Sequence, residues 1–381
     1  MILVLIPILA MLALGFIVPS KTPLKLKSFL ITLLLCFSAL LGLRFFISSK
    51  WFYPEADAIT HVRGQVDHLL HTPGWQKKPV LILEGSSATE FGINPELLEK
   101  KLAEKGIEVT LLKLSLPGAN HFERLFMMQV FLRELGKIPR DALKQAPAIL
   151  LSEVFDAYDQ NPIYLFFKEA NTQRSLVWLE PHNALMAWKS LKASLQENKN
   201  LTWIMLEHLL LNRFAIGIFS TLEPLSYQKK VSQFCPLQKT KGTFEYTKTK
   251  EAFEKSMTAS PNAEKITIPL PGWMIYYREL YEQMGTMIHT LVFYALPVLE
   301  VQRREYQTAF AAALPPHTVM LGPASLKFMK TLLQENYWFD GVHPTAAGAP
   351  LFTEWLAEEI ASHWSEIRAT RWKFSDEGSI P

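Results

Sequence analysis

The chain has 381 residues, enough to bury one large core or two modest ones. Hydrophobic residues make up 49% and charged residues 20%, which is apolar for a water-soluble enzyme, and the excess lies near the N-terminus. The net charge of +3 is small and no basic stripe with interleaved aromatic residues is present, which disfavours nucleic acid as a partner. The two cysteines, Cys36 and Cys235, belong to no CxxC or Cys/His cluster, so no metal site is expected.

Two apolar segments at the N-terminus predict a membrane anchor. Ile2–Val18 carries no charge, and Ser28–Leu43 continues past Arg44 into a further apolar run. A helix needs about 20 apolar residues to cross a bilayer, and an arginine near its end can reach the headgroups. Residues 1–50 are therefore predicted to form a transmembrane helical hairpin in the cytoplasmic membrane. The alternative is a pair of buried core helices.

The charges around these segments predict how the anchor is oriented. Lys21, Lys25 and Lys27 lie between the two apolar runs, and the positive-inside rule places that loop in the cytoplasm. The chain after Lys50 is then extracytoplasmic, or periplasmic in a bacterium with two membranes. The aromatic residues at 51–53 fit the membrane interface that such a segment would meet.

The rest of the chain alternates short apolar runs with amphipathic stretches, which predicts an α/β fold with a doubly wound parallel sheet and flanking helices. The expected strands are Val80–Leu83, Glu108–Leu114, Ala146–Leu151, Thr290–Leu296 and Thr318–Leu321. The expected helices are Asn94–Lys105, Phe122–Leu135, Met274–Met284, Val298–Ala313 and Ala346–Trp364.

One long segment breaks this alternation and divides the predicted domain in two. Residues 160–271 are rich in aromatic residues and helix-like stretches, so we expect a helical insertion that either covers the sheet edge or rests on the membrane. The two halves of the α/β domain are then 51–159 and 272–370, and 371–381 form a tail.

Three short motifs follow predicted strands or precede the last helix. They are Gly-Ser-Ser at 85–87, Pro-Gly-Ala-Asn at 117–120 and Asp-Gly-Val-His-Pro at 340–344. Ligands of an open parallel sheet bind outside the carboxyl ends of its strands, where these motifs are expected to meet. A carboxylate at Asp340 can orient the imidazole of His343, which can then deprotonate a serine. Each motif alone also fits an ordinary turn or helix entry.

In this order the motifs resemble those of the SGNH/GDSL hydrolases, across about 80–160 and 270–365. The first block reads Gly-Ser-Ser where the family has Gly-Asp-Ser. With an N-terminal anchor, this variant is similar to the membrane-anchored subgroup containing the D-alanyl transfer protein of teichoic acids and the alginate O-acetylation proteins. The resemblance implies an SGNH-like, flavodoxin-like sheet.

The resemblance also assigns roles to residues. It implies that Ser87 is the nucleophile, that His343 is the base and that Asp340 orients it. The backbone N–H groups of Ser87 and Gly118 match the family's oxyanion donors.

The third block departs from the family pattern. The family has Gly-x-Asn-Asp there, and its Asn side chain is an oxyanion donor, whereas this chain has Ser-Glu-Val at 152–154. Losing one such donor costs about 2.7–4 kcal/mol of transition-state stabilisation. Either Ser86 or Asn120 substitutes, or the enzyme is slow, or it no longer turns over. Ser86, Asn120 and Glu153 are the candidate substrate-binding residues.

The sequence therefore predicts an extracytoplasmic, membrane-anchored serine acyl-ester enzyme. The leading hypothesis is an O-acyltransferase or esterase that acts on a cell-envelope glycan or lipid substrate through an acyl-Ser87 intermediate. It needs no metal or organic cofactor, and by resemblance its partner is a membrane-bound O-acyltransferase. The alternatives are a membrane-tethered lipase or esterase that uses water, and a non-catalytic scaffold of the same fold that binds glycan or the transferase.

Overall fold

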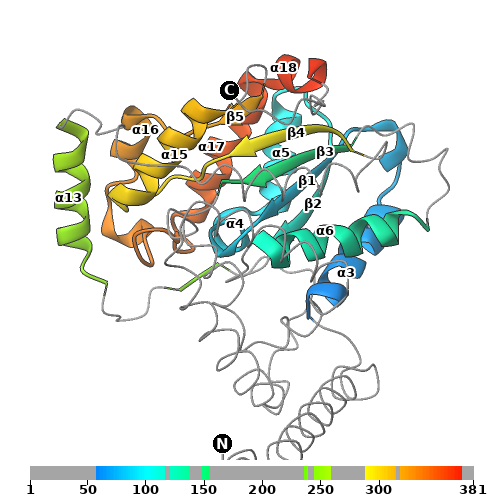
Figure 1. The fold of residues 1–381 in the computed structure, drawn as a ribbon, viewed down its shortest axis with the longest axis horizontal. Coiled ribbons are helices and arrows are strands. Elements are labelled where there is room, and N and C mark those ends of the chain that lie inside the picture. Colours follow the sequence, from blue (N-terminus) through cyan, green and yellow to red (C-terminus); the bar gives the residue numbers. More distant parts are fainter. Residues whose placement is uncertain are drawn as a thin grey trace, which may run out of the picture.

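A five-stranded parallel sheet forms the centre of the described part of the chain (Figure 1). The computed structural model describes residues 57–115, 121–137, 148–154, 236–238, 244–258, 288–314 and 318–370. The strand order is β2-β1-β3-β4-β5, and all neighbouring pairs are parallel. The strands are β1 (Val80–Gly85), β2 (Thr110–Ser115), β3 (Ala148–Glu153), β4 (Ile288–Tyr294) and β5 (Val319–Leu321). The predicted parallel α/β sheet is confirmed.

The helices lie on the two faces of this sheet (Figure 1). They are α3 (Asp57–His71), α4 (Ser87–Gly92), α5 (Pro95–Glu104), α6 (His121–Leu135), α13 (Tyr246–Thr258), α15 (Val301–Ala313), α16 (Leu326–Thr331), α17 (Ala349–Ser362) and α18 (Trp364–Ala369). Two short 3-10 helices span Trp75–Lys77 and Glu335–Tyr337. Helices α5 and α17 pack together on one face, and α3 packs with α6 on the other.

Side chains of β1 alternate between these two layers. Leu83 belongs to the hydrophobic cluster that also contains Leu98 of α5 and Leu356 of α17. The next residue, Glu84, contacts Arg124 of α6. Successive strand residues point to opposite faces, so the sheet separates an apolar layer from a layer that contains a buried charge.

Helix α3 covers the outer edge of the sheet at β2. His61 Nε2 lies 2.8 Å from the carbonyl oxygen of Lys113, and the Lys113 N–H donates to Gln65 Oε1 at 2.9 Å. An uncovered edge strand exposes backbone groups that can pair with another chain. These two side chains instead satisfy the edge within the molecule.

The helix boundaries differ from the predictions at the C-terminal end. The final helix predicted at about 346–364 is present with shifted bounds: α17 begins at Ala349 and ends at Ser362, and α18 is a separate short helix. The backbone at Gly348 passes so close to the carbonyl oxygen of Tyr337 that a side chain would not fit. The Thr345 hydroxyl accepts hydrogen bonds from the N–H groups of Ala347 at 3.2 Å and Gly348 at 3.3 Å. These bonds hold residues 345–348 in a turn, so the helix starts later. At the other end, His363 terminates α17 in a non-helical conformation.

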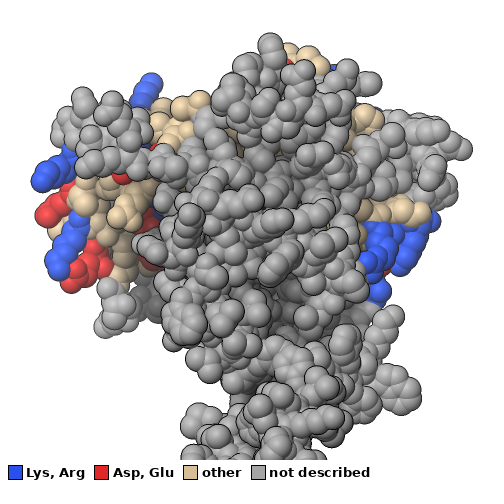
Figure 2. All heavy atoms as spheres, viewed as in Figure 1, with Lys and Arg blue, Asp and Glu red and all other residues tan. Residues whose placement is uncertain are grey.

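The helix α4 is a second difference, because only the helix opening at Asn94 was predicted. Asn94 does cap α5, where its side chain accepts a hydrogen bond from the Leu97 N–H at 3.2 Å. Helix α13 lies inside the predicted insertion. In Figure 2 its side of the molecule shows interspersed positive and negative side chains. Within or beside this helix, Lys248 pairs with Glu245 and Lys250 pairs with Glu254.

Within the described part of the chain, no helix combines the length and the apolar character needed to cross a membrane. The hairpin predicted at 1–50 lies outside the described residues, as does most of the insertion predicted at 160–271 and the whole tail at 371–381. The helix predicted at Met274–Met284 also lies outside them.

A fully buried ion pair joins β1 to α6. Glu84 and Arg124 are both 0% exposed, and Arg124 donates to both carboxylate oxygens of Glu84. Ser152 of β3 donates to the same carboxylate at 2.6 Å, and Arg124 reaches the carbonyl oxygen of Glu153 at 2.9 Å. A buried charge is tolerated only with such compensation, because transfer from water is costly.

We expect Arg124→Leu to lower the free energy of unfolding by about 3–5 kcal/mol, because Glu84 would stay in the core without its partner. Urea denaturation measures this loss. The double variant Arg124→Leu/Glu84→Leu is the control, and it should recover most of the loss because neither charge of this pair remains in the core. A loss below about 1 kcal/mol in the single variant would contradict the pair's structural role.

Candidate active site

The nucleophile predicted from the sequence begins a helix at the carboxyl end of β1. Ser86 is the N-cap of α4, and its side chain accepts a hydrogen bond from the Ala88 N–H at 3.3 Å. Ser87 is therefore the first residue of α4, and its side chain is partly exposed. A strand followed at once by a tight helix entry presents this hydroxyl at the sheet edge where ligands of such folds bind.

His343 meets this serine from the far end of the chain. The Ser87 Oγ lies 2.7 Å from His343 Nε2, although the two residues are 256 positions apart. His343 in turn lies against Asp340, with its Nδ1 2.7 Å from Asp340 Oδ2. The structure thus brings together the serine, histidine and aspartate that the sequence singled out.

The hydrogen bonds around Asp340 determine which ring nitrogen carries the proton. The carboxylate of Asp340 only accepts hydrogen bonds when it is ionised, so Nδ1 of His343 carries the proton that bridges them. Nε2 is then left with a lone pair that faces the hydroxyl of Ser87. This is the tautomer that a general base needs.

The Asp340 carboxylate is held in place by the backbone of the residues that follow it. Its Oδ1 accepts hydrogen bonds from the N–H groups of Val342 at 2.8 Å and His343 at 2.7 Å, which leaves Oδ2 for the imidazole. Burial acts to raise the pKa of the Asp340 carboxyl. The hydrogen bond and charge interaction with His343, together with the two backbone N–H groups, outweigh burial, and the net pKa lies below its usual value.

The loop that carries these two residues is closed by backbone pairing. The Phe339 N–H donates to the His343 carbonyl oxygen at 2.9 Å, and Trp338 forms an antiparallel bridge with Pro344. Trp338 is fully buried, and its indole N–H donates to the carbonyl oxygen of Leu332 at 2.7 Å. The loop is therefore anchored to the core on both sides of the imidazole.

Helix α4 packs directly on this loop. A Cβ at Gly92 would lie only 3.2 Å from Pro344 Cγ, so the lack of a side chain allows the close approach. The ring of Phe91 meets the His343 ring edge-on, with 6.2 Å between centroids. Ser87 and His343 are thus brought together by two elements that pack against each other.

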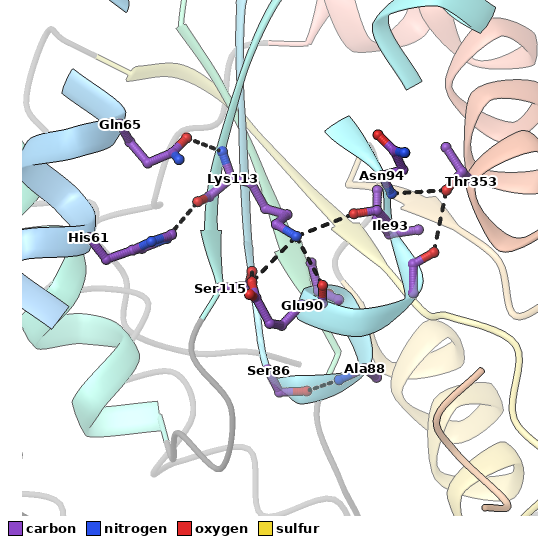
Figure 3. Close-up of polar contacts among 12 residues, drawn as sticks. His61, Gln65, Ser86, Ala88, Glu90, Ile93, Asn94, Lys113, Ser115 and Thr353 are labelled. Atoms are coloured by element: carbon purple, nitrogen blue, oxygen red, sulfur yellow. Dashed lines mark hydrogen bonds and ion pairs between the residues drawn. The ribbon is translucent and has the colours of Figure 1, made fainter. Parts of the chain in front are cut away.

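The inner side of α4 carries a buried ion pair with β2 (Figure 3). Lys113 Nζ lies 3.3 Å from Glu90 Oε2 and donates to the Glu90 carbonyl oxygen at 2.9 Å. Ser115 donates to the same carboxylate oxygen of Glu90 at 2.7 Å. These contacts attach the serine-bearing helix to the carboxyl end of the neighbouring strand.

The end of the helix is attached to α17 through a buried threonine. Thr353 Oγ1 accepts from the Asn94 N–H at 3.0 Å and lies 3.3 Å from the Gly92 carbonyl oxygen (Figure 3). Because α17 follows the His343 loop in the chain, this contact joins the two halves of the site a second time.

Of the other predicted site residues, the structure describes Ser86 and Glu153 and not Gly118 or Asn120. Ser86 is 3% exposed and both of its hydrogen-bond donors point to Glu153, itself 5% exposed. Gly118 and Asn120 lie outside the described residues. Among the described residues, no three His, Cys, Asp or Glu side chains are grouped to hold a metal ion. The pair Glu90–Lys113 was not predicted, since nothing in the sequence marks these charges as buried partners.

Comparison with known protein families and with curated proteins finds no match to this sequence. The contacts among Asp340, His343 and Ser87 define a site of the serine–histidine–aspartate type on a parallel α/β sheet.

The lowered pKa of Asp340 predicts how the site responds to acid. The folded chain gives up this proton at a lower pH than the unfolded chain, so the ionised carboxylate stabilises the fold above about pH 4, the usual carboxyl pKa. The contribution disappears as the pH falls through the lowered folded-state value. We therefore expect the difference in thermal midpoint between the wild type and Asp340→Asn to be constant at neutral pH and to shrink in acid.

Thermal unfolding monitored by circular dichroism across this pH range measures the effect. Asp67→Asn, at an exposed position of α3, is the matched control for the removal of one carboxylate. A difference that grows as the pH falls would contradict the assignment.

Proposed function

We propose that the chain is a serine acyl-ester enzyme in which Ser87 is the nucleophile, His343 the general base and acid, and Asp340 the residue that orients the imidazole. The observation that supports this most strongly is the hydrogen-bonded series Asp340–His343–Ser87, with 2.7 Å at each of its two side-chain contacts. General bases act within about 2.6–3.2 Å of the proton that they remove.

In the first half-reaction, Ser87 Oγ forms a bond to the acyl carbonyl carbon while His343 Nε2 takes the hydroxyl proton. The carbonyl π electrons move onto oxygen, and Asp340 stabilises the imidazolium that results. When the oxyanion collapses, the bond to the leaving alkoxide breaks. His343 returns the proton to that oxygen, and an acyl-Ser87 ester remains.

The oxyanion needs donors close to Ser87. The first N–H groups of a helix have no acceptor within the helix, and the Ser87 N–H is the first of α4. This supports the Ser87 N–H as one donor, with the Gly118 N–H as the second by resemblance. Ser86 is disfavoured as a donor, because its N–H and hydroxyl are both bonded to Glu153.

In the second half-reaction, an acceptor hydroxyl attacks acyl-Ser87 after giving its proton to His343, and Ser87 leaves with that proton. The resemblance to SGNH/GDSL enzymes and the apolar N-terminus favour a sugar hydroxyl of a cell-envelope glycan as the acceptor. The proposed enzyme is thus a membrane-anchored, extracytoplasmic O-acyltransferase or esterase that takes its acyl group from a membrane-bound O-acyltransferase.

A non-catalytic scaffold is the second candidate, favoured by one observation. The third block lacks the oxyanion-donating Asn of the SGNH enzymes, and the carboxylate of Glu153 in that block cannot donate when ionised. A scaffold would bind glycan or the transferase through the same fold without turning over.

A fluorophosphonate probe tests the proposed nucleophile. We expect the full-length wild type to form a covalent adduct, Ser87→Ala to form none, and His343→Ala to react about 10²–10⁴-fold more slowly because the base is gone. Mass spectrometry of the intact chain follows the labelling. Ser325→Ala is the matched control, since Ser325 caps the equally short helix α16, and it should label normally. Labelling that survives in Ser87→Ala excludes this serine as the nucleophile.

A nitrophenyl acyl ester separates the transferase from the hydrolase. We expect a burst of nitrophenol from formation of acyl-Ser87, followed by a slow phase in which water is a poor acceptor. Added oligosaccharide should speed the slow phase and become acylated, as measured by mass spectrometry of the sugar. An unchanged slow phase with free acid as the sole product would instead identify a water-using esterase. Normal cellular function of the His343→Ala variant would favour the scaffold.

A further inference from the structure

Glu153 occupies the space under the turn that presents Ser87. It is the last residue of β3, it lies level with Tyr294 of β4, and it is 5% exposed. Because β3 is the neighbour of β1, the side chain of Glu153 reaches the residues that immediately follow β1.

Three donors of that turn meet the carboxylate of Glu153. The Ser86 N–H and the Thr89 hydroxyl both donate to Oε2, the latter at 2.8 Å, and the Ser86 hydroxyl donates to Oε1 at 3.1 Å. A buried carboxylate requires such donors, and here they all come from the first turn of α4 and its cap. The side chain therefore holds residues on both sides of Ser87.

The end of β1 is shaped to admit this contact. A Cβ at Gly85 would lie 2.6 Å from Glu153 Oε2 and would also overlap the Thr89 hydroxyl. The residue before Ser86 therefore has to be glycine for the carboxylate to reach the turn. Its role is close approach, and the backbone there needs no left-handed conformation.

A buried tyrosine supports the other side of the same contact. Tyr294 Oη lies 2.6 Å from Thr89 Oγ1 and donates to the Glu84 carbonyl oxygen at 3.0 Å. Burial, with the nearby charge of Glu153, raises the pKa of Tyr294 well above its usual value, so its hydroxyl stays protonated and keeps this hydrogen bond.

We propose that Glu153 is a positioning residue for the nucleophile: it accepts hydrogen bonds from both sides of Ser87 and thereby holds the Ser87 hydroxyl at the His343 imidazole. This inference rests on the proposed function. It replaces the sequence-based expectation of a substrate contact, because both carboxylate oxygens are used inside the protein. It also gives a role to Glu153 of the third block, where the family's Asn is missing: the carboxylate is an acceptor under the nucleophile turn.

Three substitutions of Glu153 separate the effect of where the acceptor oxygens lie from the effect of the negative charge. Glu153→Gln keeps an oxygen acceptor at the same reach and removes the charge. Glu153→Asp keeps the charge but draws the acceptors back by one methylene. Glu153→Ala removes both. Glu99→Ala is the control for stability, since Glu99 Oε1 also accepts a backbone N–H, that of Leu111 at 2.6 Å, near the amino end of β2.

The readout is the rate of fluorophosphonate labelling of the full-length chain against pH, with thermal midpoints measured alongside. We expect Glu153→Gln to label at a rate within about threefold of the wild type. Glu153→Ala should label about 100-fold more slowly, because displacing a reacting group by about 1 Å costs about 100-fold in rate. The rate of Glu153→Asp should lie between those of the other two variants. The pH of half-maximal labelling should not move, since the His343–Asp340 pair is untouched. Glu99→Ala should label like the wild type.

Two results would overturn the proposal. One is labelling by the Asp and Ala variants within twofold of the wild type. The other is a Gln variant as slow as Ala, which would assign the effect to charge. If the wild type itself does not label, the proposed function fails, and crystal structures of the wild type and Glu153→Asp test the positioning role directly. We then expect the distance from Ser87 Oγ to His343 Nε2 to exceed hydrogen-bond reach in the Glu153→Asp variant and not in the wild type. An unchanged distance would refute the positioning role of Glu153.

Discussion

The position of Ser87 depends on where β1 ends relative to its two neighbours in the sheet. In the parallel register, Gly85 lies level with Ser115 of β2, and Glu84 lies level with Ser152 of β3. The next residues of the chain therefore start α4 between the carboxyl ends of two strands. Each of those strands supplies a side chain that holds the helix, so a shift in register would displace the serine from the imidazole.

Buried acidic side chains surround this point. Glu84 pairs with Arg124 on the α6 face, Glu90 pairs with Lys113 beneath α4, and Glu153 receives donors from the turn. Each of these groups costs desolvation energy that a hydrophobic side chain would not. Concentrating them at one strand end is unfavourable for stability alone, which fits a site where the direction of one hydroxyl has to be defined.

Much of the sheet and of the candidate site was predictable from the sequence. Continuous apolar runs identify the buried parallel strands, because such strands meet helices on both faces and need no alternation. Asn94 followed by proline identified a helix start, and its side chain does cap α5. The spacing of Asp340 and His343 predicted a hydrogen-bonded pair, and the strand-end rule predicted that the Gly-Ser-Ser motif at 85–87 would meet them. The choice of Ser87 within that motif came from the resemblance to the SGNH/GDSL hydrolases.

What was missed depends on contacts between distant segments. Helix α4 has six residues and ends in glycine, too short for a periodic pattern to reveal it. Lys113 and Glu84 interrupt apolar strands and would be read as solvent-facing without the packing of α4 and α6, which supply Glu90 and Arg124 as their partners. The late start of α17 at Ala349 likewise depends on the close approach of the Gly348 backbone to Tyr337, which no local propensity encodes.

The central claim is that the hydroxyl beside β1 becomes covalently acylated through the imidazole that faces it. The most direct measurement is to react the full-length chain briefly with an acyl ester, quench in acid, and locate the added mass by peptide mapping. The account predicts one acyl group on Ser87, absent when His343 is replaced by alanine. An acyl group on another residue, or no acylation of a correctly folded chain, would contradict it.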